Sequence, residues 1–485
     1  MAISSPGVGS GLDVNSIVTQ LVALEKQPLQ ALQTKASTLQ SQLSLYGTIK
    51  SQASALQDAA TTLASSASWT VQTATSSNAA AVAVSVSSTA SSSDFSLDVT
   101  RLAQAQTIAA RSIATGTAIG AGSGVGTLTL QLGSWGSAGT GPFVPGSAPA
   151  VIIDVNETDN YAAIANEINS KNAGVTATVL TSGGVDRLTL RSTTSGSATG
   201  FTLTSNSGFA NLDSLSFTSV ANPTESAFGM ESNQKGLNAT FKLNGVAVES
   251  ATNVVANVVT GVTFNLLQTT AIGSPAQIAV TQDKATVQKN IQAFADAYTA
   301  LNKTLADSTR YVSGGKSGIL QGDSTTVGLQ SLMKKIAGSS SVGSTLSRLS
   351  QVGLQQQTDG ALKLVVEIQG TGRLDNLKSA MGDMANLQKL FTTDNSNTAT
   401  NGFALKMRDF AKGLLAADGT VTNKTTALQG SITRNGVDQE RVNFRASNVE
   451  KQLRKQYSAL DAQMAQLSGL SSYVTAQLAQ WNKTS

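Results

Sequence analysis

The sequence predicts an α+β, multidomain protein with terminal α-helical coiled-coil arms, a split and mainly helical stalk domain, and inserted β-rich head domains. Three observations lead to this fold class. The last fifty residues carry a heptad repeat of apolar side chains, and the first seventy contain a long amphipathic run. Between these ends, short runs of alternating apolar and polar residues are typical of β-strands.

The C-terminal arm, residues 430–485, provides the clearest of these signals. A turn is expected at Asn435-Gly436, after which Asp438 can cap a helix that continues to Trp481 and is roughly 65 Å long. Its predicted seam consists of Leu453, Tyr457, Leu460, Met464, Leu467, Val474, Leu478 and Trp481, at spacings of three, four and seven. No charged residue lies between Asp461 and Lys483. Because an isolated helix in water usually carries charges, this one is expected to be surrounded by other helices.

The N-terminal arm, residues 1–70, has a matching pattern. Asp13 is expected to cap a short helix that ends before Pro28. The longer run that follows places apolar residues at helical spacings, namely Leu32, Leu39, Leu43, Tyr46, Ile49, Ala53, Leu56 and Leu63. We expect this arm to pair with residues 430–485. A single pair leaves much apolar surface in water, so both arms are expected to fray in the dilute monomer.

The middle of the chain is predicted to be nested. Residues 71–105 are expected to form the first part of the stalk domain and residues 281–429 its second part, with a helix that begins near residue 284. Between them, residues 106–280 read as a β-rich head of two lobes, with residues 126–215 forming the nested one. Asn244-Gly245 is expected to form a hairpin turn between two of its strands.

Composition excludes several classes of function. The 485 residues contain no Cys and no His, which removes disulfides, thiol chemistry, the usual transition-metal ligands and the commonest general base. The net charge of +4 is spread thinly, without a basic cluster that would bind nucleic acid. No apolar stretch is long enough to cross a membrane. The first residues do not show the pattern of a cleavable secretory signal, so none is expected, although the low-charge composition suits an exported bacterial surface protein.

Motifs for catalysis or ligand binding are weak, and we predict no catalytic, cofactor-binding or metal site. Residues 314–317 (GGKS) lack the first glycine of a P-loop, and residues 154–160 lack the central glycine and terminal Glu of a calcium loop. The Asp and Glu residues of the head offer no reason to choose a glycosidase pair. Trp69 is expected to be a packing anchor. Trp135 lies in a Gly/Ser loop, which makes it a candidate surface contact for a glycan or a partner, although core burial is the favoured interpretation.

Several stretches together resemble the bacterial flagellar filament cap protein family, also called the hook-associated protein 2 family. They are GSGLDV at residues 9–14, FSLDV at 95–99 with LAQA at 102–105, GILQGD at 318–323, and residues 457–478. In addition, residues 151–204 resemble a motif of flagellin-type proteins. The resemblance covers nearly the whole chain and is weakest over residues 106–150 and 205–235.

This resemblance implies a ring-like homo-oligomer at the filament tip that retains exported flagellin and promotes its folding and insertion. It also implies type III export without a cleaved signal, contacts with filament-end or junction proteins, an export chaperone on the C-terminal helix, and secondary adhesion to host mucin. The alternatives are a hook–filament junction protein, a secreted surface adhesin, or an enzyme acting on polysaccharide.

Overall fold

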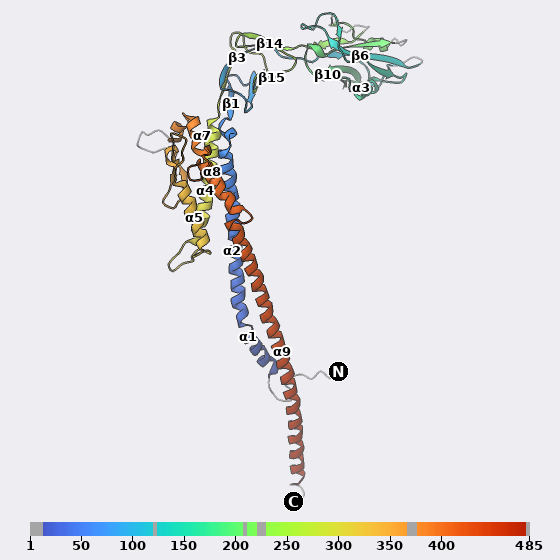
Figure 1. Ribbon diagram of the computed structural model, residues 1–485. Helices are drawn as coiled ribbons and strands as arrows, with labels where there is room; N and C mark the ends of the chain where they lie inside the picture. Colours follow the sequence, from blue (N-terminus) through green and yellow to red (C-terminus); the bar gives the residue numbers. More distant parts are fainter. Residues whose placement is uncertain (1–12, 120–123, 207–210, 221–228, 366–375, 482–485) are drawn as a thin grey trace. The chain divides into compact units, whose positions relative to one another are not determined.

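A computed structural model describes residues 13–119, 124–206, 211–220, 229–365 and 376–481 of the chain (Figure 1). The chain divides into two compact units, one formed by Met1–Trp69 together with Lys284–Ser485, and one formed by Thr70–Asp283. The first unit is mainly helical and the second is mainly β. The predicted α+β, multidomain fold class is therefore confirmed.

The helical unit has one large core. Its helices are α1 (Val14–Glu25), α2 (Gln27–Ala64), α4 (Lys284–Thr309), α5 (Ser324–Ala337), α6 (Asn376–Ala380), α7 (Met384–Thr392), α8 (Phe403–Leu415) and α9 (Thr420–Trp481). A small hairpin joins β18 (Leu354–Gln356) to β19 (Leu362–Leu364). The core takes one stripe from α2, running from Tyr46 to Leu63, and one from α4, running from Val287 to Leu305. Both stripes recur every three or four residues, which places their side chains on one helix face.

Trp69 is the anchor at the end of the α2 segment, as predicted. Its ring is fully buried and stacks on Phe391 of α7, with ring centres 5.5 Å apart. Its Nε1 donates a hydrogen bond to the backbone carbonyl of Leu63 at 2.8 Å. The indole therefore covers the last turn of α2. Its burial carries no penalty for an unpaired polar group, because its single donor is hydrogen-bonded.

The start of α9 differs from the prediction. The helix begins at Thr420 and continues through Asn435 and Gly436, so Asp438 lies inside it and does not cap it. Asn435 is buried and its Oδ1 accepts from Gln439 Nε2 at 2.7 Å, one turn later. A glycine inside a helix costs only about 1 kcal/mol relative to alanine. Tertiary packing of Val421 near the start of the helix outweighs this cost and with it the turn preference of Asn-Gly.

The β unit contains two hydrophobic cores. The first lies among β1 (Gln72–Ser76), β2 (Val82–Val86), β3 (Ser93–Arg101), β13 (Ala239–Leu243), β14 (Val246–Ser250), β15 (Val254–Val259), β16 (Val262–Leu266) and β17 (Ala276–Gln282). These strands form two antiparallel sheets, ordered β1-β17-β3-β13-β14 and β15-β16-β2. Residues 71–105, expected as the first part of the helical stalk, thus differ from that expectation, because their strands pair with strands from residues 239–282.

The second core lies among residues 107–234. Its elements are β4 (Thr107–Ala109), β5 (Ile113–Ala114), β6 (Gly126–Ser134), β7 (Val144–Pro145), β8 (Val151–Val155), α3 (Tyr161–Ser170), β9 (Val175–Ser182), β10 (Val185–Ser192), β11 (Gly200–Asn206) and β12 (Glu231–Gln234). One sheet has the order β12-β4-β10-β5 with β9 beside β10, and the other has the order β11-β6-β7 with β8 beside β6.

The hairpin predicted at Asn244-Gly245 is present. It joins β13 to β14, and Leu243 pairs directly with Val246 across the two-residue turn. Asn244 and Gly245 have φ of 51° and 83°, the left-handed values that such a turn requires. The Asn244 side chain also accepts from the backbone N–H of Ser96 in β3 at 2.8 Å, which fixes the hairpin to the next strand.

Candidate assembly surface

The first helix of the chain lies on the last one. The Asp13 side chain caps α1 by accepting from the backbone N–H of Ser16 at 3.0 Å. The cap positions a buried stripe that faces α9, where Ala446 is fully buried. The contacting residues are Val14, Val18 and Val22 of α1 with Ala446, Leu453 and Tyr457 of α9. Figure 1 shows α1 and α2 beside the same helix.

Polar contacts at both ends of α1 fix its register on α9. Near its C-terminal end, Glu25 forms an ion pair with Arg445. Near its N-terminal end, Asn15 accepts from Arg454 Nη1 at 3.0 Å. The two arginines lie nine residues apart on α9, so they bracket the apolar contact between the helices. Because both arginine side chains are substantially exposed, these pairs specify alignment more than they add stability.

Beyond Tyr457 the seam of α9 continues without a cover from any other described part of the chain. Leu460, Leu467 and Leu478 are 41%, 59% and 55% exposed. The same stretch carries further exposed apolar side chains, namely Met464, Leu470, Tyr473 and Val474. We call residues 460–478 the open seam. Monomeric proteins rarely expose so continuous an apolar stripe, and such stripes mark sites of protein association.

Apart from the exposed residues of the open seam, the predicted seam residues lie in several different surroundings. Tyr46 and Leu56 are fully buried within the core of the helical unit, and Leu39 and Leu43 pack against that core. Leu453 and Tyr457 are covered by α1, whereas Leu32 is half-buried. The side chain of Trp481 lies outside the described residues. The arm pair was expected to leave much of its apolar surface in water, but residues 46–63 differ from that expectation, because the α2 stripe is buried in the core of its own unit.

Trp135 is not a surface contact. It is only 4% exposed, and its Nε1 donates to Oε1 of the buried Gln106 at 2.9 Å. Its ring packs against Phe143 and Phe217, with centres 4.9 and 5.7 Å away. The loop composition suggested exposure, but the indole has a buried acceptor and two aromatic neighbours, which favours the core.

A buried polar junction that the sequence analysis did not identify joins α2, α5 and α9. Asp323 caps α5 by accepting from the backbone N–H of Thr326 at 3.1 Å, and Lys424 Nζ of α9 lies 2.6 Å from its Oδ2. The hydroxyl of Tyr46 donates to Asp323 Oδ1 at 3.2 Å. Burial alone raises the pKa of Asp323, but the hydrogen bonds from Lys424, Thr326 and Tyr46 outweigh it and hold that pKa below its ordinary value. The only sequence signal at this junction was the GILQGD stretch of the family resemblance, residues 318–323, which ends at Asp323.

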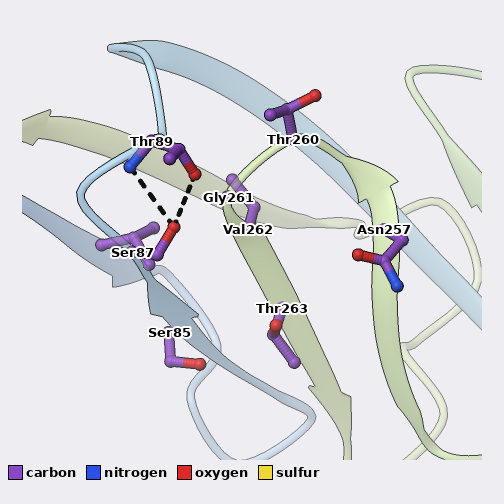
Figure 2. Close-up of a pocket in the computed structure, with 9 residues that line it drawn as sticks. Ser85, Ser87, Thr89, Asn257, Thr260, Gly261, Val262 and Thr263 are labelled. Carbon is purple, nitrogen blue, oxygen red and sulfur yellow. Dashed lines mark hydrogen bonds between the residues drawn. The ribbon is translucent and has the colours of Figure 1, made fainter.

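A polar hollow of about 480 Å³ opens beside β2 and the β15–β16 turn (Figure 2). Hydroxyl and amide groups line it, among them Ser87, Thr89 and Asn257. The Ser87 and Thr89 hydroxyls lie 2.8 Å apart in hydrogen-bond contact. The lining contains no acidic or basic side chain, so it offers no carboxylate or amine that could act as a general base.

Two further kinds of site are not found among the described residues. No group of three or more acidic side chains in the described ranges is placed to hold a metal ion. No helix within those ranges is both long enough and apolar enough to span a bilayer. The open seam is thus the feature of the described chain that most clearly suggests a function.

Comparison with known families gives matches at both ends and in the middle of the chain. Residues 10–106 match the family described as Flagellar hook-associated protein 2 N-terminus, and residues 236–469 match Flagellar hook-associated protein 2 C-terminus. Residues 137–194 match the Flagellin hook IN motif. The two hook-associated protein matches cover both units and include most of α9.

Individual relatives agree with these matches. The chain is similar to flagellar hook-associated protein 2 of Escherichia coli K12, with 28% identity over 98% of each chain, and to that of Salmonella typhimurium LT2, with 28% identity over 100% of each chain. It is also similar to the crystal structure of the flagellar cap protein FliD D1-D2-D3 domains from E. coli, with a TM-score of 0.58 and 27% identity over 79% of this chain and 99% of that one. The chain belongs to the flagellar hook-associated protein 2 family, the flagellar filament cap proteins.

Proposed function

We propose that several copies of this chain form a cap at the distal end of the flagellar filament and are joined there through the open seam. The open seam continues the α1–α9 contact along the same helix face, so it extends an interface that the chain already uses. The partner in this proposal is a second copy of the chain, whose α9 carries the same heptad pattern. Seams of this kind associate side by side in multi-stranded helical assemblies.

Burial of the open seam supplies enough free energy to drive such assembly. Each Leu-sized side chain that leaves water contributes about 1.5–3 kcal/mol when it is fully buried. The open seam contains five such side chains at heptad positions, and Leu470 and Tyr473 add further exposed apolar surface on the same stretch of helix. The absence of charge between Asp461 and Lys483 means that helices can surround α9 without burying an unpaired ion.

The assembled cap retains exported flagellin, so that subunits fold and insert beneath it. In this proposal the chain leaves the cell through the flagellar type III export apparatus without a cleaved signal. The open seam is covered before assembly by an export chaperone, because an exposed apolar helix face otherwise promotes aggregation. Neighbouring partners are filament-end or junction proteins, and adhesion to host mucin is a secondary role. The chain has no catalytic role in this scheme.

The test is a carboxylate placed in the open seam. Leu467→Asp should abolish oligomerisation, because it buries an unpaired charge in an apolar helix interface. Ala462→Asp, which places the same charge on the opposite face of the same helix, is the matched control. Sedimentation velocity measures the oligomer. Electron microscopy of a deletion strain carrying each variant then reports whether flagellin polymerises or is lost to the medium.

The outcomes separate the candidate functions. Loss of oligomer and secretion of unpolymerised flagellin for Leu467→Asp alone supports the cap. Normal assembly and filament growth for Leu467→Asp overturns the role of the open seam. If the deletion strain stops at bare hooks that complementation repairs, the hook–filament junction reading replaces the cap. Turnover of a polysaccharide that a carboxylate substitution removes would identify an enzyme.

A further inference from the structure

A hollow in the helical unit has a wall of mixed apolar and polar residues that includes the buried Lys406 and, at an exposed position, Lys335. Its volume is about 530 Å³, and it lies between α5, α8 and the segment that precedes α8. Leu332 and Ile336 of α5 and Phe410 of α8 provide apolar surface. Lys406 of α8 is only 7% exposed and forms part of the same wall. Clefts of this size with a few placed polar groups are typical binding sites.

The contacts of Lys406 are all with neutral groups. Its Nζ donates to Ser339 Oγ at 3.0 Å and to the backbone carbonyl of Ser340 at 2.7 Å, just beyond the end of α5. The same nitrogen lies 5.1 Å from the ring centre of Phe403. Within the described ranges no carboxylate lies at ion-pair distance from Lys406.

The nearby acid of the hollow is already paired elsewhere. Asp409 lines the rim, and its Oδ1 lies 2.8 Å from Arg408 Nη2, with both side chains substantially exposed. An ammonium group has three donors, and the described residues provide two hydrogen-bond acceptors for Lys406. Burial without a counter-charge also lowers the pKa of Lys406. A buried cation in this state gains free energy from any carboxylate that reaches it.

We propose that this hollow receives an acidic side chain, flanked by aliphatic residues, from an adjoining protein subunit, and that its carboxylate accepts a hydrogen bond from Lys406. The aliphatic neighbours pack on Leu332 and Phe410, whose side chains are accessible at the rim. The carboxylate neutralises the buried ammonium group. The site lies on α5 and α8, away from the open seam on α9, and provides a second, charge-specific contact.

The inference rests on the proposed assembly in one respect, because the assembly supplies the acidic segment. Binding of an acidic peptide to the hollow is therefore tested in a chain that does not assemble. The full chain carrying Leu467→Asp is titrated with the peptide acetyl-Leu-Asp-Leu-amide, and with acetyl-Leu-Asn-Leu-amide as its uncharged match. Calorimetry, or NMR of ε-labelled lysines, follows binding. The Asp peptide should bind at least about tenfold more tightly than the Asn peptide, because a charge-assisted hydrogen bond is gained.

Two variants assign the site. Lys406→Gln should reduce the affinity for the Asp peptide to that for the Asn peptide, whereas Lys412→Gln, an exposed lysine on the same helix, should leave both unchanged. Should Lys406→Gln fail to fold, Ala399→Trp fills the hollow from its exposed rim and should abolish binding of both peptides. Equal affinities for the two peptides, or a Lys406→Gln protein that still prefers the Asp peptide, overturns the proposal. If the peptide binds as expected but Leu467→Asp leaves cap assembly unchanged, only the proposed role of the open seam is refuted.

Discussion

Lys424 of α9 and Asp323 at the start of α5 form an ion pair of 2.6 Å that connects two helices separated by about a hundred residues of chain. The carboxylate has three tasks, because it also caps α5 and accepts from Tyr46 of α2. Its side chain is only 12% exposed, so water competes weakly for these contacts. Through Tyr46 and Lys424, the carboxylate of Asp323 therefore links the N-terminal and C-terminal parts of the helical unit at one point.

The first prediction concerns the pH dependence of this junction. The pKa of Asp323 is lower in the folded chain than in the unfolded chain, so its contribution to stability is present above about pH 4 and is lost as the pH falls further. Asp323→Asn keeps the cap but loses the charge, and should cost about 1–3 kcal/mol at pH 7. Urea unfolding at pH 7 and at pH 3 should show a smaller difference between variant and wild type at pH 3. An equal difference at both pH values contradicts the assignment.

A second prediction concerns hydrogen exchange along the two terminal helices. Residues 46–63 should be strongly protected in the free chain and in the assembled oligomer, because they complete the core of the helical unit. Residues 460–478 should exchange quickly in the free chain and slowly only after assembly, since nothing else in the described chain covers them. Strong protection of residues 460–478 in a dilute monomer would contradict the open seam.

A third prediction concerns the buried amide of Gln106. Its Oε1 accepts from both Trp135 Nε1 and the backbone N–H of Phe201 at 2.9 Å, and its Nε2 donates to the Phe201 carbonyl. Gln106→Ala leaves these groups without partners and should destabilise the β unit by about 2–4 kcal/mol. Chemical unfolding followed by tryptophan fluorescence measures the change. Gln277→Ala, an exposed position on β17, is the control and should have little effect.

A fourth prediction compares two glycines in the helical unit. A Cβ at Gly318 would lie 2.2 Å from the backbone carbonyl oxygen of Ser308, so Gly318→Ala must displace the loop and should destabilise the unit by about 1–3 kcal/mol. Gly328 lies inside α5 with open space around it, so Gly328→Ala should stabilise the unit by up to about 1 kcal/mol. Thermal unfolding of both variants tests the pair. The same sign of change for both would contradict this reading of the loop.

The sequence was informative where local pattern and tertiary packing agree. Strand alternation and the Asn244-Gly245 turn predicted elements of the β unit, and the helix expected near residue 284 is α4, which begins at Lys284. The stripe of α2 was recognised as apolar, but periodicity cannot say whether Tyr46 faces its own core or another molecule. The start of α9 was missed, and a surface contact at Trp135 stayed open beside core burial, because distant side chains, not local sequence, decide both.

The candidate site shows the same division. The heptad spacing identified Leu460 and Leu467 as seam residues, yet it could not show that α1 covers the seam only as far as Tyr457. Asp323 and Lys424 carry no pattern that would pair them across the chain. The burial of Lys406 could not be predicted from the sequence either, because a lysine on an amphipathic helix is normally exposed.

The β unit is one uninterrupted stretch of chain, whereas the helical unit is made from the two ends that flank it. A polypeptide that emerges N-terminus first can therefore complete residues 70–283 early. The α2 stripe and the α1 face must wait for α9, the last helix to appear. The helical unit can therefore complete its core only after α9 has emerged. In a chain that passes through a narrow channel, both terminal segments stay unpacked until then.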